Sequence, residues 1–126
     1  MAWELDGSRS IYSQLVDVIL RRIVTGIYPA GSRLDSVRDL ASEAGVNPNT
    51  MQRALTELER TGMITTQRTS GKYVTDSQEM IDKVREDMAA NSVSKLIAEM
   101  HELGFEKEDV MEIIRRNSDE RDNGVS

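Results

Sequence analysis

The chain of 126 residues has no cysteine and a single histidine. Without cysteine there can be no disulfide framework and no thiolate metal site, and a reducing cytoplasm is the expected location. The histidine, His101, has no second histidine or cysteine at ligand spacing, so we expect no bound metal and no other cofactor. Glycine-rich phosphate loops, the nucleophile elbow and the HExxH zinc motif are missing as well. The sequence therefore predicts a protein that is not an enzyme.

Long hydrophobic runs are also missing. No stretch approaches the ~20 apolar residues that cross a bilayer, and the first ten residues lack the basic flank and apolar core of a secretory signal. With 38% hydrophobic residues the chain should nevertheless fold, as one domain or as a small domain with an extension. We expect a soluble cytoplasmic protein with no membrane partner.

Acidic residues are in excess, but only in one part of the chain. The formal net charge is −6. Residues 1–76 contain nine Lys/Arg and nine Asp/Glu, whereas residues 77–126 contain seven and thirteen, so the whole excess lies in the second part. A nucleic acid would therefore meet the first part only. The change in composition near residue 76 predicts a domain boundary there.

Two amphipathic segments precede the middle of the chain. Residues 11–25 carry apolar side chains every three or four positions, as a helix with one buried face does, and Gly26 follows where a helix commonly ends. Residues 27–33 are rich in turn formers and predict a connection. Ser36 then stands three residues before an aspartate, which is the spacing of a capping box. It predicts a short helix that ends at Gly45.

The segment from Val46 to Thr61 is the one around which the chain is organised. Asn47 is a good helix N-cap, and Pro48 suits the first helical position. Apolar residues at spacings of three and four leave a polar face made of Asn49, Gln52, Arg53, Thr56 and Arg60. Such side chains can contact base edges and phosphates in a DNA major groove. Taken alone, this pattern is more often an ordinary surface helix, but a short helix and a tight glycine turn precede it, in helix-turn-helix order.

A β-hairpin is predicted next. Residues 63–67 and 72–75 are β-prone runs separated by four turn residues. Three helices followed by a hairpin make a winged helix, in which Arg68 and Lys72 lie at the wing, where they can touch phosphate or the minor groove. We therefore expect residues 1–76 to form a winged helix-turn-helix DNA-binding domain. On their own, the two basic side chains would more often serve solubility.

The remainder, residues 77–126, predicts two helices. A long apolar stripe ends at Leu103-Gly104-Phe105, and a second helix begins after Glu106, with acids in its first turn that suit the helix dipole. Two such helices cannot bury their stripes against each other alone. A second subunit is the expected partner, which makes this a two-helix dimerisation region; packing back on the DNA-binding domain is the alternative. The tail from Asn117 to Ser126 is polar and expected to fray.

Four motifs occur in an order and spacing that resemble those of the GntR family of bacterial transcription regulators. They are Ile11-Tyr12-x-Gln14, Gly26-x-x-x-x-Gly31-x-x-Leu34-x-Ser36-Val37-Arg38-x-Leu40-Ala41, Val46-Asn47-Pro48-Asn49-Thr50-x-x-Arg53-Ala54-Leu55 and Gly71-x-Tyr73-Val74-Thr75. The match covers about residues 3–75. The short two-helix extension is similar to that of the YtrA subfamily, whose members look like dimers without a large effector-binding domain.

This resemblance implies a homodimeric repressor that binds a palindromic operator in double-stranded DNA. It also implies contact roles at positions matching the family's motifs: Arg38 in the second helix, Asn47, Asn49, Thr50, Gln52 and Arg53 in the recognition helix, and Ser70 and Gly71 at the wing tip. The alternative is a winged-helix protein-interaction or antitoxin-like module whose acidic helices bind a basic partner. Whether a small-molecule effector acts on the protein stays open, since the second part is too short to enclose a sizeable pocket.

Overall fold

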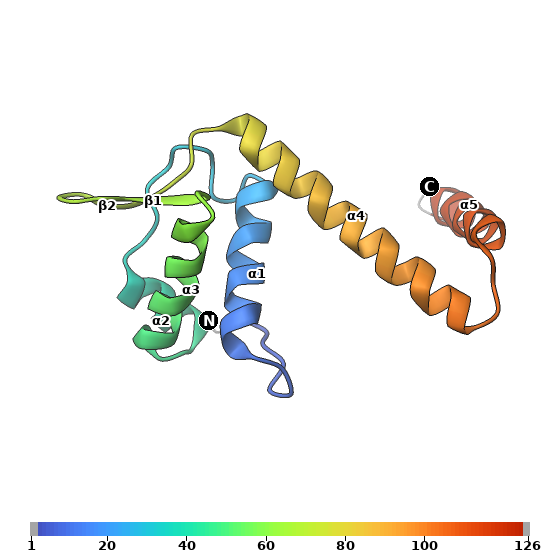
Figure 1. Cartoon of the computed structure of the whole chain (residues 1–126), viewed down its shortest axis with the longest axis horizontal. Coiled ribbons are helices and arrows are strands. Elements are labelled where there is room, and N and C mark those ends of the chain that lie inside the picture. The colour runs from blue at the N-terminus through green and yellow to red at the C-terminus, as the bar shows by residue number, and fades with distance from the viewer. Residues whose placement is uncertain (1–2, 125–126) are drawn as a thin grey trace. The chain divides into compact units, whose positions relative to one another are not determined.

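The computed structural model describes the backbone of residues 3–124 and the side chains of residues 3–119. Its elements are α1 (Ile11–Val24), α2 (Val37–Ala44), α3 (Pro48–Arg60), β1 (Ile64–Gln67), β2 (Gly71–Val74), α4 (Gln78–Glu102) and α5 (Lys107–Gly124) (Figure 1). They form two compact units, Met1–Arg85 and Glu86–Ser126, and α4 belongs to both. The predicted fold, mostly helical with one hairpin in winged-helix order, is confirmed.

The first three helices begin at polar side chains that cap free backbone N–H groups. The side chains of Ser10, Ser36 and Asn47 accept hydrogen bonds of 3.3, 3.1 and 2.7 Å from backbone nitrogens two or three residues later. Gly45 ends α2 in the left-handed conformation, at φ 76°. Because only one residue separates this glycine from the Asn47 cap, α2 and α3 are joined by the tight turn that the sequence predicts.

The core of the N-terminal unit lies between α1 and α3, which run side by side (Figure 1). The apolar stripe of each helix is buried, with Leu15, Ile19, Met51, Ala54 and Leu55 all fully covered. Burial of each large side chain stabilises the fold by about 1.5–3 kcal/mol. Since the buried side of α3 faces this core, its polar side is directed outward.

The hairpin is extended by a third segment that the sequence did not predict as β structure. β1 and β2 pair antiparallel, with Ile64 opposite Val74. The backbone N–H of Leu34 donates to the carbonyl of Lys72, and that of Val74 donates to the carbonyl of Ser32, both at 2.9 Å. The end of the connection between α1 and α2 therefore pairs with β2 along its other edge.

The C-terminal unit contains most of α4, a turn at Gly104 and α5. Its apolar side chains are largely uncovered, with exposed fractions of 54% for Val93, 72% for Leu103 and 53% for Met111. The prediction of a frayed tail is wrong for its greater part, because α5 continues to Gly124. The last two residues of that tail lie outside the described part.

Candidate nucleic-acid interface

The polar face predicted for the central helix is exposed on α3. Asn49, Gln52 and Arg53 are exposed and Thr50 is half-buried, while Met51 between them is fully buried. Helical spacing thus separates the buried side from a side made of amide and guanidinium groups. These groups match the donor and acceptor pattern of bases in the major groove, with Asn or Gln suited to adenine and Arg to guanine.

Asn47 combines two functions at the start of this helix. Its side-chain oxygen accepts the 2.7 Å bond from the backbone N–H of Asn49, so the oxygen is occupied by the cap. The amide nitrogen carries two N–H donors, and the residue is exposed. Beyond the cap, the side chain can therefore act on a ligand chiefly as a donor.

Two further side chains of the face are held in place by neighbours. The amide nitrogen of Gln52 donates to the hydroxyl of Thr56 at 3.1 Å. The guanidinium of Arg53 lies over the ring of Tyr12 on α1, 4.7 Å from its centroid. Such contacts restrict the rotamers of long polar side chains before any ligand arrives.

The wing residues differ from one another in exposure and in their contacts. Arg68 is exposed in the turn between β1 and β2, Ser70 is half-buried, and Gly71 has φ 106°, a conformation that strains any other residue. Lys72 instead points back to α3, where its ammonium pairs with the carboxylate of Glu59 and lies 3.1 Å from the hydroxyl of Thr66. Lys72 joins the wing to the end of α3.

The electrostatics of Glu59 agree with this pairing. Partial burial raises the pKa of its carboxyl, but hydrogen bonds from Lys72 and Thr66 and the lysine charge outweigh it and leave the pKa below the ordinary value of 4.5. The carboxylate is therefore charged at neutral pH. The side chains of Lys72 and Glu59 are 16% and 28% exposed, so water screens the pair only in part.

Four arginines of the N-terminal unit form no ion pair within the described residues: Arg33, Arg38, Arg53 and Arg68. Arg38 is exposed in the first turn of α2, and its contact with DNA stays a prediction. Arg33 was missed because it lies in a segment read as a plain connection. Its Nε is 3.3 Å from where a Cβ at Gly71 would stand, which places it beside the wing. Unpaired cations on α2, α3 and the wing suit a polyanion.

A groove of about 390 Å³ separates the wing from the start of α2. Residues 33–37, which include the basic Arg33 and the acidic Asp35, line it on one side, and residues 66–72 line it on the other. It thus brings Arg33 and Arg68 to the rim of one depression. Backbone phosphate is a ligand of suitable charge for this position.

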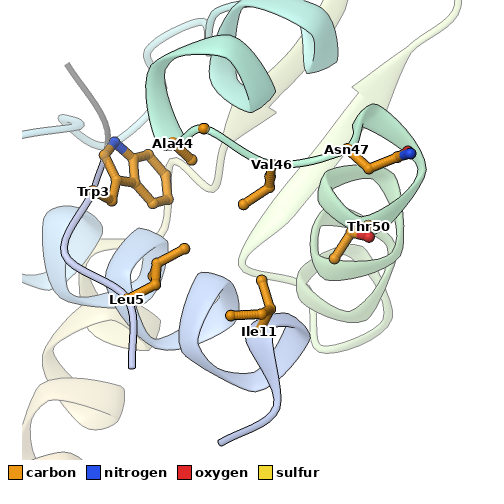
Figure 2. Close-up of a pocket in the computed structure, with 8 residues that line it drawn as sticks. Trp3, Leu5, Ile11, Ala44, Val46, Asn47 and Thr50 are labelled. Atoms are coloured by element: carbon orange, nitrogen blue, oxygen red, sulfur yellow. The ribbon is translucent and has the colours of Figure 1, made fainter. Parts of the chain in front are cut away.

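A second groove, of about 450 Å³, lies beside the turn between α2 and α3. Figure 2 shows Leu5, Ile11 and Val46 directed toward a common space, whereas the amide of Asn47 points away from it. The walls are mainly apolar. Asn47 and Thr50 also line it, so this groove adjoins the polar face at the start of α3.

The N-terminal segment is fastened to the helix-turn-helix by a cluster that sequence patterns did not reveal. The indole N–H of Trp3 donates to Glu43 at 2.6 Å, and Arg22 donates to the same carboxylate oxygen at 2.8 Å. The Arg22 guanidinium also lies 4.5 Å from the Trp3 ring centroid. The hydrogen bond from Arg22, followed by that from Trp3, holds the pKa of Glu43 below its ordinary value. This cluster fixes α2 against α1.

The described part of the chain contains neither a cluster suited to a metal ion nor a helix suited to a bilayer. His101 is exposed, and no group of three or more histidine and acidic side chains there could hold a metal ion. Among the described helices, none has both the length and the apolar character needed to cross a bilayer.

Comparison with known proteins places these features in a family. Residues 11–74 match the family model of bacterial regulatory proteins, gntR family. The chain is 34% identical to the HTH-type transcriptional regulator YhcF of Bacillus subtilis (89% of this chain, 93% of the relative). It is also 34% identical to the HTH-type transcriptional repressor YtrA of Bacillus subtilis (89% and 87%). A GntR family transcriptional regulator from Listeria monocytogenes superposes with a TM-score of 0.84 at 43% identity (89% and 98%).

Proposed function

This chain belongs to the gntR family of bacterial regulatory proteins and is a DNA-binding transcription regulator, and we propose that it represses transcription by binding a palindromic operator as a homodimer. The repressor assignment draws on the relative YtrA, whose name describes a repressor. We place the protein in the cytoplasm, where bacterial DNA lies, and propose a binding role without a catalysed reaction.

The observation that carries the proposal is the outward polar face of α3 together with the arginines that form no ion pair among the described residues. Asn49, Gln52 and Arg53 are exposed and directed away from the core. We propose that they contact base edges in the major groove, with Asn47 and Thr50 at the same end of the helix. Each bidentate base contact contributes about 1–3 kcal/mol of discrimination between bases.

Contacts to phosphate would hold the recognition helix in position. We assign this role to Arg33, Arg38 and Arg68, with Ser70 and Gly71 bringing the wing tip close to the DNA backbone. We assign Lys72 to support of the wing, since its ammonium is paired with Glu59. Phosphate contacts fix register but do not read sequence, so α3 would determine which operator is bound.

The C-terminal unit would form the contact with the second subunit. Val93, Leu103, Met111 and Ile114 are between 47% and 72% exposed, which is costly for large apolar side chains in water. Burial of these side chains between two copies would remove that cost. Twofold symmetry would then present two α3 helices to half-sites about 34 Å apart on an inverted repeat.

A binding titration tests the proposal. The purified chain is titrated against DNA from the promoter region of its own gene and against a duplex of the same composition in scrambled order. We expect at least about a thousandfold preference for the promoter DNA at physiological salt. In cells, deletion of the gene should raise the activity of that promoter. Equal affinity for both duplexes would refute a sequence-specific regulator, and a promoter that loses activity would refute repression.

A further inference from the structure

The ring of Tyr12 lies against Arg53, a proposed base-contacting residue. Tyr12 lies in the first turn of α1 and Arg53 lies in α3, so the contact joins two elements that pack against each other. The guanidinium carbon is 4.7 Å from the ring centroid, inside the range of about 6 Å for attraction between a cation and a ring. Tyr12 is half-buried, whereas Arg53 is exposed.

A carboxylate one helical turn away does not compete for this arginine. Glu57 follows Arg53 by four residues, a spacing at which acidic and basic side chains commonly pair. Both of its carboxylate oxygens are bound by Arg60, at 3.0 and 2.5 Å. Arg53 is therefore left to the ring of Tyr12.

The difference between a ring and a carboxylate as partner affects what Arg53 can do. A carboxylate would neutralise the guanidinium, and its ion pair would have to break before the arginine met DNA. An aromatic ring attracts the cation through one face and leaves its charge and its N–H donors available. Stacking also limits the rotamers of a long side chain before binding, which lowers the entropy lost when the contact to DNA forms.

We infer that Tyr12 is a positioning residue for sequence readout: its ring holds the Arg53 guanidinium in the orientation in which it meets the operator. This inference rests on the proposed DNA contact of Arg53. Tyr12 itself lies on α1, outside the recognition helix, and affects which bases are preferred through the arginine.

The test compares Tyr12→Leu, which removes the ring, with Tyr12→Phe, which keeps the ring and removes only the hydroxyl. Affinity is measured by fluorescence anisotropy for the operator and for operators with single base-pair changes. Tyr12→Leu should weaken operator binding about two- to fivefold for each subunit, the size expected for an exposed contact between a cation and a ring, and so about four- to 25-fold for the dimer. It should also reduce discrimination at the base pair that becomes tolerant in Arg53→Ala. Tyr12→Phe should remain within about twofold of the wild type.

A double variant distinguishes positioning from a general structural effect. In the Arg53→Ala background, Tyr12→Leu should cause no further loss, because the arginine that the ring holds is gone. Ser13→Ala, at an exposed position next to Tyr12, is the matched control and should bind as the wild type does. Thermal unfolding of each variant reports whether it is folded.

A measurement on the free wild-type protein does not depend on the variants. NMR should show the side-chain CH₂ protons of Arg53 nearest the guanidinium shifted upfield by the ring current of Tyr12. An unshifted resonance would overturn the inference, and so would a Tyr12→Leu variant that binds the operator as tightly as the wild type or more tightly. A wild-type chain that does not prefer the operator would instead refute the proposed function, and the inference with it.

Discussion

Replacement of Arg68 and of Lys72 by glutamine tests whether a basic wing residue is free to bind phosphate or already paired. Both side chains belong to the wing, and both variants remove one positive charge per subunit. Arg68 forms no ion pair within the described residues, while Lys72 is paired with Glu59. We expect Arg68→Gln to change the salt dependence of operator binding and Lys72→Gln to leave it nearly unchanged.

The magnitude follows from counterion release. Each phosphate neutralised by the protein contributes about −0.9 to the slope of log affinity against log salt. If Arg33, Arg38 and Arg68 each neutralise one phosphate in both subunits, the slope is about −5; if Arg53 does so too, it is about −7. Arg68→Gln should make the slope shallower by about 1.8, because one contact is lost in each subunit. Raising the salt from about 50 to 200 mM lowers the affinity of both proteins. The factor by which it lowers the affinity of the variant should be about twelve times smaller than the factor for the wild type.

The assay is a series of anisotropy titrations on a labelled operator duplex at increasing salt. Lys72→Gln leaves Glu59 partly buried without its partner, so Glu59→Gln/Lys72→Gln serves as the control in which both charges are removed. We expect both variants to keep the wild-type slope within about 0.5. A slope that Lys72→Gln flattens as much as Arg68→Gln does would refute the reasoning, since the ion pair would then break on DNA.

Three further predictions concern other parts of the chain. Asn47→Asp keeps a good cap, so the temperature of unfolding should be unchanged or higher, but operator affinity should fall because an acceptor and a negative charge replace a donor; equal affinity would contradict a DNA contact. The hydrogen bonds from Arg22 and Trp3 lower the pKa of Glu43, so the stability they provide is present above about pH 4.5 and is lost as the pH falls through the lower pKa of the folded protein. The fluorescence of Trp3, the single tryptophan, should shift to the red over that range, and Glu43→Gln should abolish this dependence on pH; a variant that keeps the wild-type shift would contradict it. Ile114→Asp should yield a monomer in analytical ultracentrifugation with weaker operator binding and an intact N-terminal unit, whereas a dimer that persists would place the subunit contact elsewhere.

Features set by neighbours in sequence could be predicted from the sequence. The caps at Ser36 and Asn47 and the left-handed Gly45 depend on residues within one turn, and all three occur where local pattern placed them. The outward polar face of α3 follows from helical spacing in the same way. These local rules were sufficient to order the helices and the hairpin.

Features that depend on distant residues could not be predicted in this way. The pairing of Leu34 with Lys72 joins segments 38 positions apart, and no β pattern marks the first of them. The link between Lys72 and Glu59 crosses from the wing to α3, so sequence alone could not distinguish this lysine from the unpaired Arg68. The contact of Tyr12 with Arg53 likewise requires the packing of α1 on α3.

The pairing of Ser32 and Leu34 with β2 affects how far the operator DNA must deform when the protein binds. Because the lead-in to α2 is hydrogen-bonded to the wing, a movement of the wing relative to the helix-turn-helix would have to break these bonds. If the wing keeps this position on DNA, adjustment falls to the duplex, whose bendability and minor-groove width vary with sequence. Base pairs in the operator that no side chain touches should therefore influence affinity, and flexible pyrimidine–purine steps there should be favoured.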